Sequence, residues 1–392
     1  MGLIELERAA LEPDVIFAAA HVVPSRLAKI PDGSDRFVYA SRGSFSISSM
    51  SRTLDNLPLA AENEIVMTAK GLIPRSIDSV RSTPFPEVPE MRGRVMSIAS
   101  SMLGARLAVV NDRGVIMLAT CNLDGNTTAG RTPLFRSIST FSAAPPICDS
   151  GGWCAVSLHS FDPHVAAVGL KPAKCVRWFE QDVCVREIHP IGSISGELSC
   201  GSRIDHPNEL LLTEGSAWSR WDIRASERGG LIARRAPNGG FGSRHDSSLL
   251  TIDVCGDALA VGGEPRTASL YDLRMDKHVR EHWNGCVQGE IRWLRLVHNG
   301  NAVLVSSSHN EVALGAWNEE FASELRKKYE LKSEVSDEYM TSGARIVRGE
   351  QRVLMFRTDE PLLGISFEKA TRNFEYDFIG VTFASAMYRF SL

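Results

Sequence analysis

Two neighbouring stretches of the chain decide its fold. The first is Glu209-Leu-Leu-Leu-Thr213 with Ser219-Arg-Trp-Asp-Ile-Arg224, and the second is Ala258-Leu-Ala-Val-Gly-Gly263 with Ser269-Leu-Tyr-Asp-Leu-Arg274. Each reads as an apolar strand, a turn that contains glycine, and a second strand that ends in an aromatic residue followed by Asp. Short apolar strands joined by such turns predict antiparallel hairpins. The recurrence of one ending predicts a repeated supersecondary unit.

Five further hairpins of the same plan lie outside these stretches, at residues 36–48, 105–120, 165–179, 302–317 and 378–392. From Trp178 through Trp221 and Tyr271 to Trp317, the aromatic endings recur about every 45 residues, which is the length of a four-stranded propeller blade. Two packed β-sandwiches are the alternative fold, and this near-regular spacing disfavours them. The first twelve residues, rich in Glu and Leu, predict a short helix.

These endings resemble those of the WD40 repeat family, and the resemblance is carried by Arg177-Trp178-Phe179, Trp221-Asp222, Tyr271-Asp272 and Trp317-Asn318. It covers residues 150–320 in register and the two ends by hairpin count. The chain departs from the family pattern because it has a single Trp-Asp dipeptide among these endings and no Gly-His dipeptide.

The resemblance implies an all-β fold, a single seven-bladed WD40-like β-propeller that occupies residues 1–392. We expect long loops in the N-terminal blades and a helical insertion near residues 319–342. Family architecture also implies that a strand within residues 1–24 closes the ring beside the C-terminal hairpin, since an open seam would expose strand edges. The candidate closing strands are Leu3–Leu6 and Ile16–Val23.

Composition narrows the function classes. Lys and Arg number 43 against 47 acidic residues, a formal net charge of −4, which is not the balance of a dedicated nucleic-acid binder, although a local basic face stays open. No apolar run reaches the 18 residues that would span a bilayer, and the N-terminus lacks the features of a signal peptide. The eight cysteines form no C-x-x-C pair, so buried free thiols in a reducing compartment are expected. We therefore expect an intracellular protein of the nucleus, the cytoplasm or both.

The two central endings carry the first candidate partner-binding residues, Trp221, Asp222 and Arg224 together with Tyr271, Asp272 and Arg274. Both endings resemble the W/Y-D-x-R pattern of WD40 substrate receptors of cullin-4 ubiquitin ligases. That resemblance implies that Arg224 and Arg274 contact a DDB1-type adaptor. The chain departs from the receptor pattern at Arg220 and Ala268, and a basic residue after Trp-Asp also serves simply to solvate a strand end.

Two other segments are candidates for partner binding. Arg234 and Arg235 lie among the glycines of residues 229–242, where they predict either a basic contact for an acidic peptide or RNA, or a flexible loop between blades. In residues 319–332, Phe321, Leu325 and Tyr329 recur every four positions among charges, which is typical of an amphipathic helix. That helix packs on the rim of the ring or projects toward a partner, and both readings stay open.

One motif resembles a metal site, His278-Val-Arg-Glu281-His282, the H-x-x-E-H signature of some zinc proteases. The motif needs a helix, but the repeat places a strand here, and two histidines four residues apart on a strand are about 13 Å apart. We predict no metal, no cofactor and no catalytic residue. The function expected is a non-catalytic protein-interaction scaffold, a subunit of a nuclear-pore, trafficking, chromatin or RNA-processing complex. The alternatives are a cullin-4 receptor and, more weakly, an enzyme.

Overall fold

The computed structural model of the chain describes residues 5–10, 27–29, 36–41, 44–49, 67–68, 71–72, 75–76, 82–84, 94–101, 103–121, 135–145, 152–225, 230–237, 247–275, 279–328, 351–358, 362–369, 376–382 and 386–391. Within these residues the strands form seven sheets, which are numbered here in chain order.

Sheets 1 to 4 contain β2, β3, β4 and β8 to β20. Sheet 1 has β2 (Leu27–Lys29), β3 (Arg36–Ser41), β4 (Ser44–Ser49) and β8 (Ser82–Pro84). Sheet 2 has β9 (Val95–Ser101), β10 (Arg106–Asn111), β11 (Val115–Cys121) and β12 (Phe135–Ser142). Sheet 3 has β13 (Cys154–Leu158), β14 (Val165–Leu170), β15 (Cys175–Glu180) and β16 (Val183–Ile188). Sheet 4 has β17 (Ile194–Cys200), β18 (Glu209–Glu214), β19 (Ala217–Asp222) and β20 (Leu231–Arg235).

Sheets 5 to 7 contain the rest. Sheet 5 has β21 (Leu249–Cys255), β22 (Ala258–Gly263), β23 (Thr267–Asp272) and β24 (Val279–Asn284). Sheet 6 has β25 (Ile291–Val297), β26 (Ala302–Ser307), β27 (Glu311–Ala316) and β28 (Arg352–Arg357), with the short strands β6 (Gly71–Leu72) and β5 (Met67–Thr68) at its edge. Sheet 7 has β29 (Leu362–Lys369), β30 (Tyr376–Thr382), β31 (Ala386–Ser391), β1 (Glu5–Ala10) and β7 (Arg75–Ser76).

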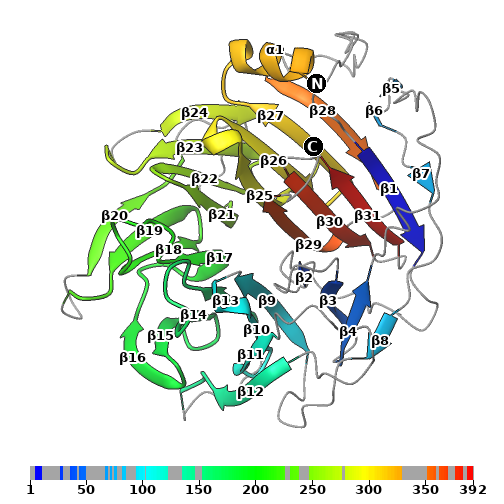
Figure 1. Cartoon of the computed structure of the whole chain (residues 1–392). Helices are drawn as coiled ribbons and strands as arrows, with labels where there is room; N and C mark the ends of the chain where they lie inside the picture. Colours follow the sequence, from blue (N-terminus) through cyan, green and yellow to red (C-terminus); the bar gives the residue numbers. More distant parts are fainter. Residues whose placement is uncertain are drawn as a thin grey trace.

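The sheets follow one another around a common centre (Figure 1), and the first strand of each lies nearest to that centre. These inner strands contact those of the neighbouring sheets from β25 back through β21, β17, β13, β9 and β2 to β29. This arrangement is a β-propeller, as the sequence predicts. All seven predicted hairpins are confirmed as antiparallel strand pairs.

The predicted N-terminal helix is wrong, because residues 5–10 form strand β1. This strand pairs antiparallel with β31, from Glu5 opposite Ser391 to Ala10 opposite Ala386. Pairing to an open sheet edge outweighs the local helix propensity of a Glu- and Leu-rich segment. Of the two candidate closing strands, Leu3–Leu6 overlaps β1 at Glu5 and Leu6, whereas Ile16–Val23 lies outside the described residues.

The core lies between neighbouring sheets rather than at the centre of the ring. Trp218 of sheet 4 packs edge-on against Tyr271 of sheet 5, with ring centroids 5.1 Å apart, and both side chains are buried. Near the central axis the backbones themselves touch: a Cβ added to Gly196 on β17 would lie 2.0 Å from the carbonyl oxygen of Leu250 on β21. At this point the two inner strands are packed backbone to backbone.

Helix α1 (Glu319–Lys328) follows β27, within the region of the predicted helical insertion. The side-chain oxygen of Asn318 caps the helix by accepting the backbone N–H of Phe321 at 2.7 Å. Residues 329–342 of the predicted insertion lie outside the described residues.

Candidate partner-binding site

The two W/Y-D-x-R endings occupy matching places in neighbouring sheets. Asp222 ends β19 opposite Glu209, and Asp272 ends β23 opposite Ala258, so both arginines begin the turn to the fourth strand. The third strands of the two sheets, β19 and β23, run toward the same face of the propeller. Arg224 and Arg274 therefore lie at the same end of sheets 4 and 5.

Each arginine folds back onto the aspartate two residues before it. The backbone N–H of Arg224 and its Nε both donate to Asp222 Oδ1 at 3.0 Å, and Nη2 donates to Oδ2 at 2.8 Å. Arg274 repeats the pattern on Asp272, at 3.0, 3.0 and 2.6 Å. We call these two pairs the arginine forks, since each combines an Asx turn with a bidentate ion pair.

In each fork the aspartate and the arginine are both charged, and the two charges cancel. Hydrogen bonds from the guanidinium lower the pKa of Asp222 and bring the pKa of Asp272 to about 2. The same hydrogen bonds raise the pKa of Arg224 and Arg274. The two arginine side chains are 69% and 67% exposed. They present guanidinium groups to solvent, each already bound to a carboxylate of its own chain.

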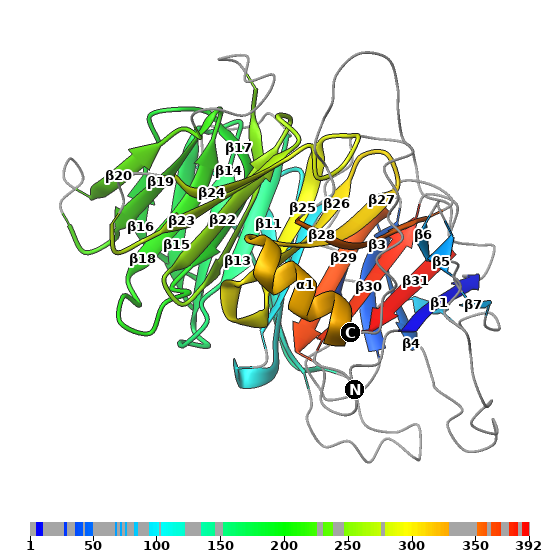
Figure 2. The same ribbon diagram turned by 90° about the horizontal axis from the view of Figure 1, so that it is seen from above.

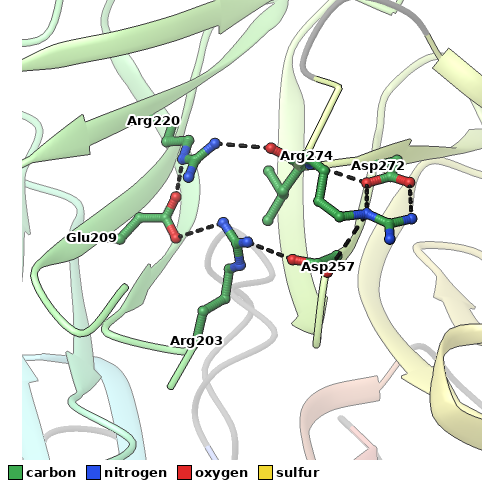
Figure 3. Close-up of polar contacts among 7 residues, drawn as sticks. Arg203, Glu209, Arg220, Asp257, Asp272 and Arg274 are labelled. Carbon is green, nitrogen blue, oxygen red and sulfur yellow. Dashed lines mark hydrogen bonds and ion pairs between the residues drawn. The ribbon is translucent and has the colours of Figure 1, made fainter. Parts of the chain in front are cut away.

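A charge network extends inward from the second fork (Figure 3). Asp257, in the turn between β21 and β22, pairs with Arg274 at 3.6 Å and also with Arg203 of sheet 4. Arg203 is buried and reaches Glu209 at 3.4 Å. Glu209 also pairs with Arg220, which donates from Nη1 to the carbonyl oxygen of Leu273 at 3.0 Å. The network therefore joins sheets 4 and 5 through mutually compensated charges, of which Arg203, Glu209 and Arg220 are buried.

Trp221 and Tyr271, predicted as contact residues, are core residues. Both side chains are buried, at 7% and 2% exposure. Trp221 donates its indole N–H to Ser219 Oγ at 2.8 Å, and Tyr271 packs on Trp218. Burial raises the pKa of Tyr271 to about 12. Of each ending, only the Asp-x-Arg part reaches solvent.

Arg234 and Arg235 lie at the other end of sheet 4, because Trp221 pairs with Leu231 and Trp218 with Arg235. Arg234 donates from Nε to Glu214 Oε1 at 3.2 Å, and Glu214 is fully buried. Arg235 Nη1 donates to the carbonyl oxygen of Arg234 at 2.9 Å. These residues do not join the forks in one site.

Helix α1 packs on the ring (Figure 2). Leu325 is buried and Phe321 half-buried in the cluster between sheets 6 and 7. Arg326 fastens the helix by donating from Nε to the carbonyl oxygen of Arg352 on β28 at 3.2 Å. Phe321 and Leu325 therefore serve this packing, as the first of the two readings of the helix expects. Tyr329 lies outside the described residues.

The H-x-x-E-H motif falls on strand β24, with His278 outside the described residues. His282 Nδ1 lies 2.9 Å from Ser269 Oγ, in hydrogen-bonding contact. Within the described residues no group of three or more metal-ligating side chains is found, and no helix there is long and apolar enough to cross a membrane.

Sequence reasoning missed a second polar cluster on the inner strands. Arg295 of β25 donates from Nη1 to Glu197 Oε2 of β17 at 3.1 Å, across the intervening sheet 5. Thr251 donates to the same oxygen at 2.7 Å, and Asp253 accepts the backbone N–H of Leu296 at 2.7 Å. Burial raises the pKa of Asp253 to about 6, against the attraction of Arg295. Alternating polar residues on first strands are the only sequence signal for such a cluster.

Comparison with known proteins supports the fold alone. No family model and no curated protein matches the sequence. Among solved structures, the chain is similar to a WD40 β-propeller component in "Crystal Structure of Mitotic Checkpoint Complex", with a TM-score of 0.59 and 10% sequence identity over 99% of this chain and 91% of that one. Because many other solved structures match as well, the likeness establishes a WD40-like propeller and singles out no activity.

Proposed function

We propose that this protein is a non-catalytic interaction scaffold, a propeller subunit of an intracellular multi-protein complex of the nuclear-pore, trafficking, chromatin or RNA-processing type. The observation that carries the proposal is the way the sheets are joined. Ion pairs link sheet 4 to sheet 5 through Arg203, which is buried, and sheet 4 to sheet 6 through Arg295, which is half-buried. Because neighbouring and next-neighbouring sheets are linked by ion pairs, the ring offers partners a surface that loses little conformational entropy on binding.

The test is affinity purification of the tagged protein from its native cells, followed by mass spectrometry and light scattering. We expect co-purification of the same subunits at a fixed stoichiometry. A protein recovered as a lone monomer under gentle extraction would contradict the scaffold role. A turnover measured with the purified single chain would instead favour the enzyme alternative.

The second candidate, a substrate receptor of a cullin-4 ligase, is favoured by the arginine forks. Arg224 and Arg274 are exposed to the same extent, in the same geometry and at the same end of adjacent sheets. The test is binding of purified DDB1 to the wild type and to the variants Arg224→Ala and Arg274→Ala. Loss of binding in both variants, with unchanged melting temperatures, supports the receptor role. Wild-type protein that fails to bind DDB1 excludes it.

A further inference from the structure

Four large apolar side chains project into solvent from turns of four consecutive sheets. They are Leu103 (39% exposed), Phe161 (46%), Ile204 (74%) and Met275 (72%), and we call them the tip arc. Large apolar residues are uncommon at exposed turn positions, where Gly, Asn, Asp, Ser and Pro dominate. An apolar side chain repeated at such positions in neighbouring sheets indicates a surface that is covered in use.

All four side chains lie at one end of the propeller. Leu103, Phe161 and Ile204 lie between the first and second strands of sheets 2, 3 and 4, and Met275 lies after the third strand of sheet 5. In an antiparallel sheet the first and third strands run in the same direction, so the turns that follow them meet at the same face. The arginine forks lie at this face too.

The turns that carry the tip arc contact one another in order. A Cβ added to Gly104 would lie 2.7 Å from Cβ of Pro163, so the turn of Leu103 contacts the turn of Phe161. His159 beside Phe161 bonds to the carbonyl oxygen of Pro207 beside Ile204, at 2.6 Å. Ion pairs join the turn of Ile204 to that of Met275, because Asp257 pairs with both Arg203 and Arg274. The four turns that carry the tip arc are thus joined in order from sheet 2 to sheet 5.

The backbone that presents Phe161 is fixed from within. His159 Nδ1 accepts the backbone N–H groups of Phe161 and Asp162, at 3.0 and 2.8 Å, which leaves the hydrogen on Nε2 to be donated to Pro207. The imidazole is buried, packs edge-on against Trp178, and leaves no room for a side chain at Gly201, whose φ is +53°. An exposed aromatic ring on a fixed backbone has the properties of a binding hot spot.

The arginines beside the tip arc are already compensated. Arg203, Arg224 and Arg274 border it, and each is bonded to carboxylates of this chain. Asp205, next to Ile204, is exposed at the same turn. An acidic partner would have to displace the carboxylates of this chain and would face Asp205, whereas an apolar partner leaves the ion pairs in place. The complementary surface is therefore apolar, without an excess of acidic groups.

We propose that the tip arc binds a short segment of another protein that contributes two or more large apolar side chains and no excess of acidic groups. This inference rests on the proposed scaffold function and deepens it by naming the face and the chemistry of the partner. Phe161 and Ile204 are the central anchors, since they occupy the middle of the arc.

The test is a selection of short random peptides displayed on phage against the wild-type protein, with counter-selection against the double variant Phe161→Ser, Ile204→Ser. We expect the enriched peptides to carry at least two Leu, Ile, Met, Phe or Trp residues and no excess of acidic groups. Phe161→Ser alone and Ile204→Ser alone each raise the Kd of the selected peptides by about tenfold or more, as loss of a hot-spot side chain does. Raising NaCl from about 0.05 to about 0.5 M changes Kd less than about threefold, because screening acts on charges.

Ile191→Ser is the matched control. Ile191 is 68% exposed and lies between β16 and β17, at the opposite end of the sheets, so its loss leaves the Kd of the selected peptides unchanged. Three results overturn the inference: no peptide distinguishes the wild type from the double variant, the enriched peptides are acidic and salt-sensitive, or the wild type forms a dimer that the double variant abolishes. The last result would assign the tip arc to a second copy of this chain.

Co-purification separates this inference from the proposed function. If the folded double variant retains every subunit that the wild type co-purifies, the scaffold role stands and the tip arc is not the docking face. If the wild type co-purifies no subunit, the scaffold role itself fails.

Discussion

Replacement of Asp253 by Asn tests whether burial among the inner strands disfavours the charge of this carboxyl group. The carboxyl group of Asp253 lies beside Arg295, and it accepts the backbone N–H of Leu296. Burial raises its pKa from the ordinary value of 3.8 to about 6. An amide keeps the acceptor oxygen for Leu296 and removes the charge that burial disfavours.

The sign of the effect follows from proton linkage. Because the folded chain binds the Asp253 proton more tightly than the unfolded chain does, this group favours the folded state most below pH 4. That contribution is lost as pH rises from about 4 to about 6. A shift of about two pKa units corresponds to at most about 3 kcal/mol. The residue as a whole is half-buried, so we expect Asp253→Asn to raise the free energy of unfolding by about 1–2 kcal/mol at pH 7.5 and by little at pH 4.

The assay is urea unfolding of both proteins between pH 4 and pH 8 at constant ionic strength. Asp205→Asn is the control, since it makes the same replacement at an exposed aspartate. The reasoning is refuted if Asp253→Asn is less stable than the wild type at pH 7.5. It is also refuted if the stability difference does not depend on pH.

Three further substitutions test how the sheets are joined and how helix α1 packs on them. Gly196→Ala places a methyl group against the carbonyl oxygen of Leu250, and we expect a loss of about 3 kcal/mol or more, measured by urea unfolding. Arg203→Met leaves Glu209 with Arg220 as its remaining partner, and we expect a loss of about 1–3 kcal/mol, measured as a lower melting temperature. Leu325→Ala opens a cavity under helix α1 and costs about 2–3 kcal/mol by the same measurement.

Each of these predictions has a result that contradicts it. Gly215→Ala is the control for Gly196, because its added Cβ meets open space and costs only the strain of a positive φ, about 1 kcal/mol. Equal losses at the two glycines would contradict the close approach of β17 and β21. Arg203→Met with wild-type stability would mean that the network does not join sheets 4 and 5. A Leu325→Ala variant that keeps its melting temperature but loses a partner would restore the partner-binding reading of α1.

The hairpins were predictable because their information is local. An apolar strand, a glycine turn and a second apolar strand specify an antiparallel pair whatever surrounds them. The helix predicted for the N-terminal segment was wrong for the opposite reason. Residues 5–10 form a strand because β31, at residues 386–391, offers an open edge, and no local pattern reports that partner. The pairing agrees with the closing strand that the WD40 resemblance implies within residues 1–24.

The candidate site was predictable only in part. The Asp-x-Arg pairs could be read from the sequence because the pattern lies within four residues, and their binding of a partner stays a prediction. Trp221 and Tyr271 were predicted as contacts, but their side chains are buried, because the same pattern does not say which side chains turn into the core. The network of Arg203 with Asp257, and that of Glu197 with Arg295, join residues far apart in the chain, and only the folded ring brings them together.

The most direct test of the account is hydrogen exchange of the protein within the complex purified from its native cells, compared with the protein alone. We predict slower exchange on assembly in turns 103–105, 159–164 and 201–208, which carry three residues of the tip arc. Slower exchange confined to turns 171–174 and 264–266, at the opposite end of the sheets, would contradict the account. Unchanged exchange at both ends would contradict it equally.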